Sequence, residues 1–371
     1  MHKALKLVYA TCFLDVSGVT KINFDILSGL AVNWEIHVCV TQRDDQPPTI
    51  WDKRFKEVFG EPLDLWRIPA RERYCSFVSF LVRYQIDLVY ITHSLWLYEH
   101  VARLKRDLPG VRFIDSLHVL EPYCFRGGYP DISANRFVHP YIDMSILISH
   151  DLRQYLIRNY PVNPEKLVVV HNGIDSGGFK RQIGAGHGLR TELELSPTDK
   201  LIGFIGRFAV QKRPLFFLEI ARDLCKYDPH VRLYMVGSGP LSGKIRRFIA
   251  RNDLNGKIHL LENRDDIPSL LNVTELLLLP SAYEGAPLTI LEALSVGVPV
   301  VASDVGAVRE YVNDMCRLVP LGRGGAKERE KYVISVRECL AVGGGAGFLA
   351  PEHKLDEVIA RYHRIFEGAV V

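Results

Sequence analysis

The chain has 371 residues, of which 47% are hydrophobic and 24% charged, which is typical of a globular protein with two domains of ordinary size. A net charge of +3 does not predict nucleic-acid binding, and no hydrophobic run approaches the ~18–20 residues of a membrane span. Seven cysteines without a C-x-x-C pair favour reduced thiols over disulfides or zinc, so we expect a cytoplasmic protein.

Short hydrophobic strands alternate with helices through the first half of the chain. The predicted strands are Leu5–Phe13, Glu35–Gln42, Asp87–His93, Val111–His118 and Lys166–Asp175. The predicted helices are Ile22–Leu30, Trp51–Gly60, Ser76–Gln85 and Leu95–Leu108. This alternation predicts a mostly parallel α/β layer, interrupted by a polar, irregular segment at Tyr123–Ser133.

Two residues in this half follow predicted strands. Gly18 lies in the first strand-to-helix turn, where α/β folds bind ligands, although the turn lacks a G-x-G-x-x-G fingerprint and a lone glycine is more often only a turn. His118 ends a strand and could accept a hydrogen bond from a sugar hydroxyl. A lone histidine is usually structural, so both interpretations stay open.

Residues 176–198 are rich in glycine and lack periodicity, which predicts a linker or mobile loop between a first domain at 1–175 and a second at 199–350. The second domain repeats the α/β order, with strands at Asp199–Phe208 and Val231–Pro240 and a helix at Tyr332–Leu340. Residues 351–371 are predicted to form a closing helix. The repetition predicts two doubly wound domains, with a ligand in the cleft between them.

The most informative stretch is a strand, a loop, a helix and a second strand over Glu275–Tyr311. A helix that begins beyond a parallel strand presents free N–H groups, which favour a phosphate. Glu284 and Glu292 would flank that phosphate with carboxylates that accept hydroxyl groups, as a sugar nucleotide requires. The alternative is a plain βαβ unit in which Glu292 pairs with an arginine.

Arg207 and Lys212 follow another strand in the sequence GRFAVQKRP and could hold a diphosphate, or could be two solvated charges at a helix start. The chain has no D-x-D pair for a nucleotide-bound metal. We therefore expect arginine, lysine and helix N-termini, rather than Mg²⁺ or another cofactor, to neutralise the phosphates.

Three motifs together resemble the retaining glycosyltransferases of family four, which have the GT-B fold. In chain order they are HNGID (His171–Asp175), GRFAVQKRP (Gly206–Pro214) and EGAPLTILE (Glu284–Glu292), which is the order that the family shows. The resemblance implies two Rossmann-like domains that face each other across a cleft, and a last helix that crosses back to the first domain.

The resemblance also implies roles for single residues. Arg207 and Lys212 would hold the donor diphosphate, and Glu292 the ribose. Glu284 would orient the transferred sugar. Backbone N–H groups around Leu288 and Thr289 would contact the phosphates.

The resemblance also assigns roles to Gly18, His118 and Arg264, which lie outside these three motifs. Gly18 matches a glycine loop near the diphosphate and the acceptor, but many members have two adjacent glycines where this chain has Ser17-Gly18. His118 matches a histidine that contacts the donor sugar. The nucleotide base is expected near Glu262–Arg264, so Arg264 completes the predicted donor site.

The implied reaction is metal-independent transfer of a hexose-type sugar from a nucleotide diphosphate to a hydroxyl of a glycan or a lipid-linked acceptor, with retention. A UDP, GDP or ADP donor would fit equally well. The alternatives are a sugar-nucleotide epimerase or phosphorylase of GT-B architecture and a non-catalytic binding module. Trp66–Arg73 and Tyr74–Tyr84 mix aromatic and basic residues, which fits either peripheral contact with the inner membrane face or a buried helix after a charged loop.

Overall fold

The computed structural model describes residues 4–15, 17–42, 48–118, 136–182, 187–262, 264 and 266–370. The chain forms two compact units. Unit 1 comprises Met1–Gly173 and Glu352–Val371, and unit 2 comprises Ile174–Pro351. The predicted irregular segment Tyr123–Ser133 lies outside the described residues.

Unit 1 is built on a parallel sheet of seven strands in the order β3-β2-β1-β4-β5-β6-β7. The strands are β1 Leu5–Thr11, β2 Trp34–Val40, β3 Leu63–Asp64, β4 Leu88–Thr92, β5 Arg112–Leu117, β6 Met144–Leu147 and β7 Leu167–Val169. The chain runs from β1 to one edge and then returns to β4 on the other side of β1. The carboxyl ends of β1 and β4 therefore mark the switch point, where sheets of this kind bind ligands.

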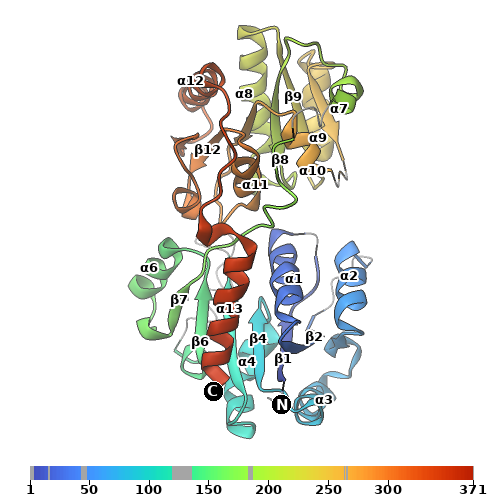
Figure 1. Ribbon diagram of the computed structural model, residues 1–371, viewed down its shortest axis with the longest axis vertical. Helices are drawn as coiled ribbons and strands as arrows, with labels where there is room; N and C mark the ends of the chain where they lie inside the picture. The colour runs from blue at the N-terminus through green and yellow to red at the C-terminus, as the bar shows by residue number, and fades with distance from the viewer. Residues whose placement is uncertain are drawn as a thin grey trace. The chain divides into compact units, whose positions relative to one another are not determined.

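Six helices described in unit 1 accompany this sheet (Figure 1). They are α1 Gly18–Leu30, α2 Ile50–Phe59, α3 Ala70–Tyr84, α4 Leu95–Asp107, α6 His150–Asn159 and α13 Leu355–Val370. Local side chains fix several helix starts. Thr49 and Asp52 form a reciprocal capping box at α2, and Ser17 accepts a hydrogen bond from the Thr20 amide at α1.

Helix α13 follows unit 2 in the sequence but packs on α1 in unit 1. Gly29 permits this approach, because a Cβ there would lie 2.3 Å from the Cδ1 atom of Ile359. The indole of Trp34 donates a hydrogen bond of 3.0 Å to Nδ1 of His363. The last helix is thus an integral part of the first unit's core.

Unit 2 has a parallel sheet of six strands in the order β10-β9-β8-β11-β12-β13. The strands are β8 Lys200–Ile205, β9 Val231–Val236, β10 Ile258–Leu261, β11 Leu276–Leu279, β12 Val300–Asp304 and β13 Cys316–Pro320. The helices are α7 His187–Glu192, α8 Pro214–Tyr227, α9 Ser242–Arg251, α10 Ile267–Asn272, α11 Leu288–Val296 and α12 Ala326–Val342.

Alternate residues of β8 enter two separate hydrophobic clusters in unit 2. Ile202 and Phe204 pack with residues of α8, α9 and α12, whereas Leu201 and Ile205 pack with residues of α7, α10 and α11. Because successive side chains of a strand point to opposite faces, helices cover both faces of this sheet. The predicted fold class, two α/β Rossmann-like domains with parallel sheets, is confirmed.

Several element boundaries differ from the sequence-based expectations. Helices α1, α3 and α12 begin earlier than predicted, because their first turns are polar or charged and carry little hydrophobic periodicity. Gly18 is consequently the first residue of α1 and does not lie in the preceding loop. The last predicted strand of unit 1, Lys166–Asp175, shrinks to the three residues of β7.

The described part of the glycine-rich segment 176–198 does not consist of loop alone. It contains α7, and Leu189 and Leu193 are buried in a hydrophobic cluster of unit 2. Six residues are too few for periodicity to show in the sequence. The sequence analysis also missed β13, a strand at the sheet edge that ends in Pro320.

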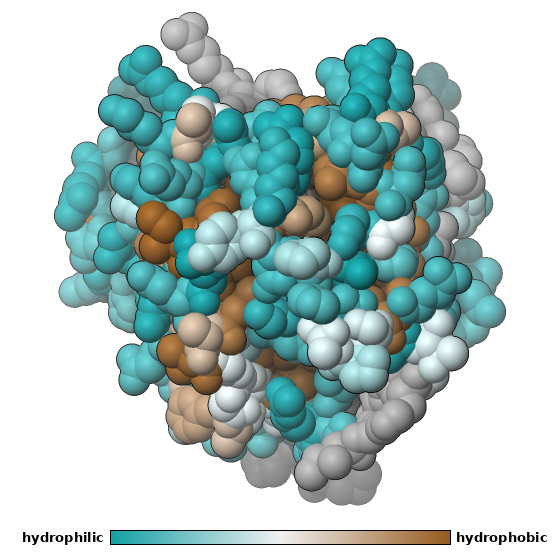
Figure 2. Space-filling view, turned by 90° about the horizontal axis from the view of Figure 1, so that it is seen from above, coloured by the Kyte–Doolittle hydropathy of each residue, from teal (hydrophilic) through white to brown (hydrophobic). Residues whose placement is uncertain are grey.

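Hydrophilic side chains cover most of the coloured surface on the face drawn in Figure 2, and hydrophobic ones appear between them in small areas. Isolated exposed hydrophobic residues of this kind are normal for folded proteins. None of the described helices has the length and apolar character needed to cross a bilayer. None of the six cysteines that the structure describes forms a disulfide.

Candidate functional site

The central contact of the candidate site is an ion pair between two of the sequence motifs. Lys212 Nζ lies 2.7 Å from Oε1 and 2.8 Å from Oε2 of Glu284. Lys212 ends a short 3-10 turn after β8, and Glu284 lies in the loop between β11 and α11. Because β8 and β11 are neighbours in the sheet, their carboxyl ends bring these loops together.

Backbone contacts fix the two loops against each other. The Ala282 amide donates a hydrogen bond of 2.7 Å to the carbonyl of Gln211, and the Gln211 side chain donates one of 3.2 Å to the Tyr283 carbonyl. Gly306 has φ +51°, and a Cβ there would lie 2.0 Å from the Glu284 carbonyl oxygen. The loop that carries Glu284 is therefore held closely from two sides, and the Glu284 side chain is only 6% exposed.

Helix α11 presents an uncapped N-terminus. Its N-cap residue is Pro287, which makes no side-chain capping bond, and Leu288 and Thr289 are its first two residues. The first N–H groups of a helix have no partner within the helix, so those of Leu288 and Thr289 are available to an anion. Gly297 ends the helix in the left-handed region with φ +87°.

Glu292 lies one helical turn into α11 and is 7% exposed. The remainder of the helix is apolar nearly all round, so this carboxylate is a costly residue to bury without a function or a partner. The structure places Glu292 on the same helix whose N-terminus follows Glu284. Both glutamates of the E-x7-E motif thus belong to one local structure in unit 2.

Arg207 and Arg264 have different surroundings. Arg207 is exposed in the loop after β8, and no carboxylate of the described residues pairs with it. Arg264 pairs with Glu192 of α7 and with Asp266, both of which raise the pKa of its guanidinium. Arg207 is therefore free to meet a ligand phosphate, whereas the Arg264 side chain braces α7 within unit 2.

The glycine turn Gly237–Gly239, after β9, packs directly on the loop that carries Arg207. A Cβ at Gly237 would lie 2.1 Å from the Gly206 carbonyl oxygen, and Phe208 donates a backbone hydrogen bond of 2.8 Å to Ser238. The contact shows what the turn does: it supports the β8 loop from the neighbouring strand.

In unit 1, His118 is buried at the carboxyl end of β5. Its Nε2 lies 2.8 Å from Oγ of Ser116 and 3.5 Å from Nδ2 of Asn23, whereas its Nδ1 has no hydrogen-bond partner among the described residues. Burial, and secondarily the nearby His93, lower the pKa of His118 to about 3. His118 is therefore a neutral imidazole at physiological pH.

The sequence analysis did not identify His93, which directly follows β4. It has φ +54°, a conformation that a non-glycine residue rarely adopts, and its ring meets that of His118 edge-on at 6.2 Å. Burial lowers the pKa of His93 to about 4, against an opposing effect of Asp15. One signal in the sequence could have identified His93: it is a polar residue that directly follows a buried strand, and that strand neighbours the strand that ends at His118.

The beginning of α1 lies at the same edge of the unit 1 sheet. Asp15 accepts hydrogen bonds of 2.6 Å from the Ser17 hydroxyl and 2.7 Å from the Thr20 hydroxyl. Ser17 in turn caps the helix that Gly18 begins. In each unit, then, the predicted site residues that the structure describes cluster at the carboxyl ends of the strands, except that Arg264 serves an internal ion pair.

Comparisons with known proteins agree with this geometry. A model of the family described as "Glycosyltransferase Family 4" matches residues 16–177, and one described as "Glycosyl transferases group 1" matches residues 199–327. The chain is 32% identical over 319 residues to a UDP-Gal:alpha-D-GlcNAc-diphosphoundecaprenol alpha-1,3-galactosyltransferase of Escherichia coli, and the match covers 82% of this chain and 80% of that protein. The chain belongs to family four of the GT-B glycosyltransferases.

Other similar proteins share less sequence identity with this chain. The chain is 25% identical over 314 residues to a D-inositol 3-phosphate glycosyltransferase of Segniliparus rotundus, which covers 78% of this chain and 69% of that protein. A solved structure of Anabaena Alr3699/HepE in complex with UDP shares the fold with a TM-score of 0.79 at 17% identity over 98% of this chain and 100% of that one. The glycosyltransferase WaaG gives a TM-score of 0.67 at 15% identity, over 98% of each chain.

Proposed function

We propose that this glycosyltransferase transfers a hexose-type sugar from a nucleotide diphosphate to a hydroxyl group of a glycan or lipid-linked glycan, with retention of anomeric configuration. The observation that carries the proposal is the pairing of Lys212 with Glu284 beside the uncapped N-terminus of α11, which also bears Glu292. This arrangement combines a cation, free N–H groups and two buried carboxylates. A sugar nucleotide has matching groups: a diphosphate, a sugar and a ribose.

The diphosphate would lie at the N-terminus of α11, contacted by the backbone of Leu288 and Thr289. Arg207 and Lys212 would add positive charge on the leaving group, where negative charge builds up during transfer. Glu292 would accept hydrogen bonds from the ribose. Glu284 would orient the hydroxyls of the transferred sugar, and its contact with Lys212 keeps both side chains in place.

This donor site neutralises phosphate without a divalent metal. Two cationic side chains and a helix N-terminus supply the positive charge that Mg²⁺ supplies elsewhere. We therefore propose metal-independent transfer, and expect an enzyme treated with EDTA to keep its activity. A loss of activity that Mg²⁺ or Mn²⁺ restores would contradict the proposal.

In unit 1, a neutral His118 with an available Nδ1 is suited to accept a hydrogen bond from a sugar hydroxyl. Gly18, at the exposed start of α1, would leave room for the acceptor or the diphosphate. The acceptor hydroxyl would attack from the face that the nucleotide leaves, and a donor phosphate oxygen would take its proton. This route accounts for retention without a protein nucleophile.

The E. coli relative supports a narrower donor and acceptor. Its name specifies UDP-Gal as donor and a GlcNAc-diphosphoundecaprenol as acceptor. We accordingly propose a UDP-hexose donor and a lipid-linked acceptor for this chain as well. A lipid-linked acceptor requires the enzyme to work at a membrane surface.

A membrane contact would involve the turn before α3 rather than α3 itself. The helix buries Tyr74, Phe77 and Leu81 in the core of unit 1, so its apolar face is not available to lipid. Trp66 is 44% exposed, and the Arg73 guanidinium lies 4.6 Å from its ring centroid. Flotation with vesicles that contain anionic lipid tests this contact, and a protein that stays at the bottom of the gradient would exclude it.

The first experiment is a thermal-shift panel of UDP, GDP, ADP, dTDP and their common sugar conjugates, in buffer with EDTA. A ligand that binds the native state must raise its melting temperature. We expect UDP and one UDP-hexose to give the largest shifts. We further expect the enzyme to transfer that hexose to a lipid-linked acceptor with an α linkage. No shift with any nucleotide would refute the donor site. Binding without turnover would favour a binding module, and conversion of the donor sugar without an acceptor would favour an epimerase.

A further inference from the structure

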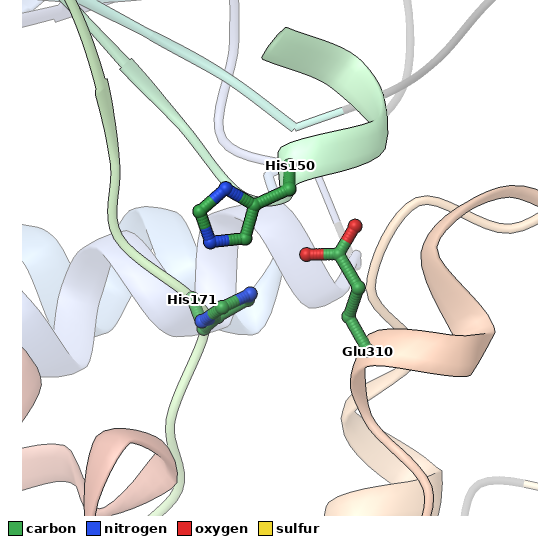
Figure 3. Close-up of side chains that lie close together, drawn as sticks. All are labelled: His150, His171 and Glu310. Atoms are coloured by element: carbon green, nitrogen blue, oxygen red, sulfur yellow. The ribbon is translucent and has the colours of Figure 1, made fainter. Parts of the chain in front are cut away.

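Three histidines lie together in unit 1, close to both places where the chain passes between the units. His150 is the first residue of α6, His171 precedes Gly173 by two residues, and His353 directly follows Glu352. The ring centroids of His150 and His171 are 5.6 Å apart, and those of His171 and His353 are 5.4 Å apart. Figure 3 shows the imidazoles of His150 and His171 near each other; Glu310, also labelled there, belongs to unit 2.

The strand register explains why His150 and His171 meet. Parallel strands β6 and β7 pair Leu147 with Val169, so the residues just beyond the two strands emerge at one edge of the sheet. Ser149 then caps α6 through a hydrogen bond of 3.0 Å from the Leu152 amide to its hydroxyl, which sets His150 in the first turn. The approach of the two rings is thus a consequence of the sheet and of a helix cap.

The segment that carries His171 is held firmly by the beginning of the C-terminal region. Nδ1 of the buried His353 lies 3.1 Å from the Asn172 carbonyl oxygen. Gly173 allows close packing, because a Cβ there would lie 2.8 Å from Val358 Cγ2 and 2.9 Å from the His353 carbonyl oxygen. His171 is therefore presented on a rigid backbone, while His150 is exposed and its side chain can adjust.

We propose that His150 and His171 form a binding site for a divalent transition-metal ion of the Zn²⁺ class. A nitrogen of each ring lies within 4.8 Å of one on the other ring. Two imidazoles bound to zinc at ~2.0–2.1 Å in tetrahedral geometry have nitrogens roughly 3.4 Å apart, so a modest rotation of the exposed His150 suffices. Water would complete the coordination sphere.

The chemistry of the ligands decides which ions fit. Imidazole nitrogen suits Zn²⁺, Co²⁺, Ni²⁺ and Cu²⁺, whereas Mg²⁺ and Ca²⁺ prefer oxygen. The site is separate from the proposed donor site, whose residues in unit 2 it does not include, and it leaves metal-independent transfer unaffected. A bound ion would link the start of α6 to the segment where the chain leaves unit 1, and would stabilise that edge of the unit.

The test is a titration of the full-length, metal-stripped protein with Co²⁺, followed by its visible d–d absorption, and then displacement of Co²⁺ by Zn²⁺. We expect saturable binding of one ion, and no displacement by Mg²⁺ at the same concentration. His150→Ala and His171→Asn should each weaken Co²⁺ binding at least about tenfold. His230→Ala is the matched control, since it removes a surface histidine of unit 2 and should leave the affinity unchanged.

The proposal would be overturned by the absence of a saturable Co²⁺ spectrum in the parent protein, or by an unchanged affinity in His150→Ala. The latter variant is decisive even if His171→Asn does not fold, because His150 is exposed in the first turn of its helix. Its melting temperature without metal should match that of the parent. Displacement of Co²⁺ by Mg²⁺ at equal concentration would also contradict a site made of imidazoles.

Discussion

Replacement of Lys212 by methionine should destabilise unit 2 even without any ligand. The Lys212 side chain is 19% exposed and that of its partner Glu284 only 6%, so the variant leaves a nearly buried carboxylate without its ammonium partner. Loss of one member of a buried ion pair lowers the free energy of unfolding by about 3–5 kcal/mol. Because Lys212 is partly exposed, we expect a loss at the lower end of this range, about 3 kcal/mol. For a unit of the size of Ile174–Pro351, this corresponds to a melting temperature lower by roughly 6–12 °C.

The assay is differential scanning calorimetry of the parent, Lys212→Met, Glu284→Gln and the double variant. The double variant removes the stranded carboxylate charge, so it should be more stable than the sum of the two single effects predicts, by about 1–3 kcal/mol. A Lys212→Met protein that melts within 2 °C of the parent would refute the reasoning. So would strictly additive effects in the four-protein cycle.

Arg213 provides a control next in sequence to Lys212. Its guanidinium pairs with Glu328 at 2.8 Å and 3.1 Å, and the two side chains are 13% and 5% exposed. Arg213→Met therefore breaks a comparably buried ion pair that has no proposed role in donor binding. Both variants should lose stability, but only Lys212→Met should also lose the thermal shift caused by UDP-hexose. Equal losses of that shift would assign Lys212 a purely structural role.

Three further predictions concern single residues. Arg207→Ala should lower turnover by about 10²-fold or more, because its charge would act mainly in the transition state; near-normal turnover would exclude that role. Glu292→Gln should weaken donor binding in a titration by calorimetry, and unchanged affinity would contradict the ribose contact. The folded-state pKa values of His118 (about 3) and His93 (about 4) lie below the ordinary value of 6.5. At a pH between the folded-state pKa and 6.5, the unfolded state therefore binds more protons than the folded state. The free energy of unfolding of unit 1 should thus be highest above pH 6.5 and fall by roughly 2 kcal/mol per histidine between pH 6.5 and pH 5. A His118→Asn variant whose free energy of unfolding changes with pH as steeply as that of the parent would contradict this.

The sequence was sufficient for the central parallel strands and for the local motif around α11, but not for edge strands such as β13. Strands such as β1 and β11 are short hydrophobic runs bounded by turn residues, and Gly297 ends α11 as its position before Pro299 predicts. Elements whose stability comes from tertiary contacts were not predictable in this way. Helix α7 is only six residues long, and its retention depends on burial of Leu189 and Leu193 against the sheet.

Side-chain contacts over long sequence distances were the other limit. The spacing of the motifs suggests that Lys212 and Glu284 serve one ligand, but it does not show that they pair with each other across 72 positions. His93 was missed for a similar reason. Its importance depends on a ring contact with His118 and on a left-handed backbone, and neither has a signature in a single sequence.

The sheet order explains why the candidate residues gather where they do. In unit 2 the chain runs outward from β8 and then returns to β11 on the other side of β8, so the loops that follow these two strands meet; they carry Lys212 and Glu284. Unit 1 repeats this order with β1 and β4, and the residues after these strands include Gly18 and His93. Each unit therefore places polar, ligand-competent groups at its own topological switch point, where backbone groups at the carboxyl ends of adjacent strands diverge and leave room for a ligand. The same topology thus accounts for the position of the candidate residues within each unit, although the residues of the two units share no motif.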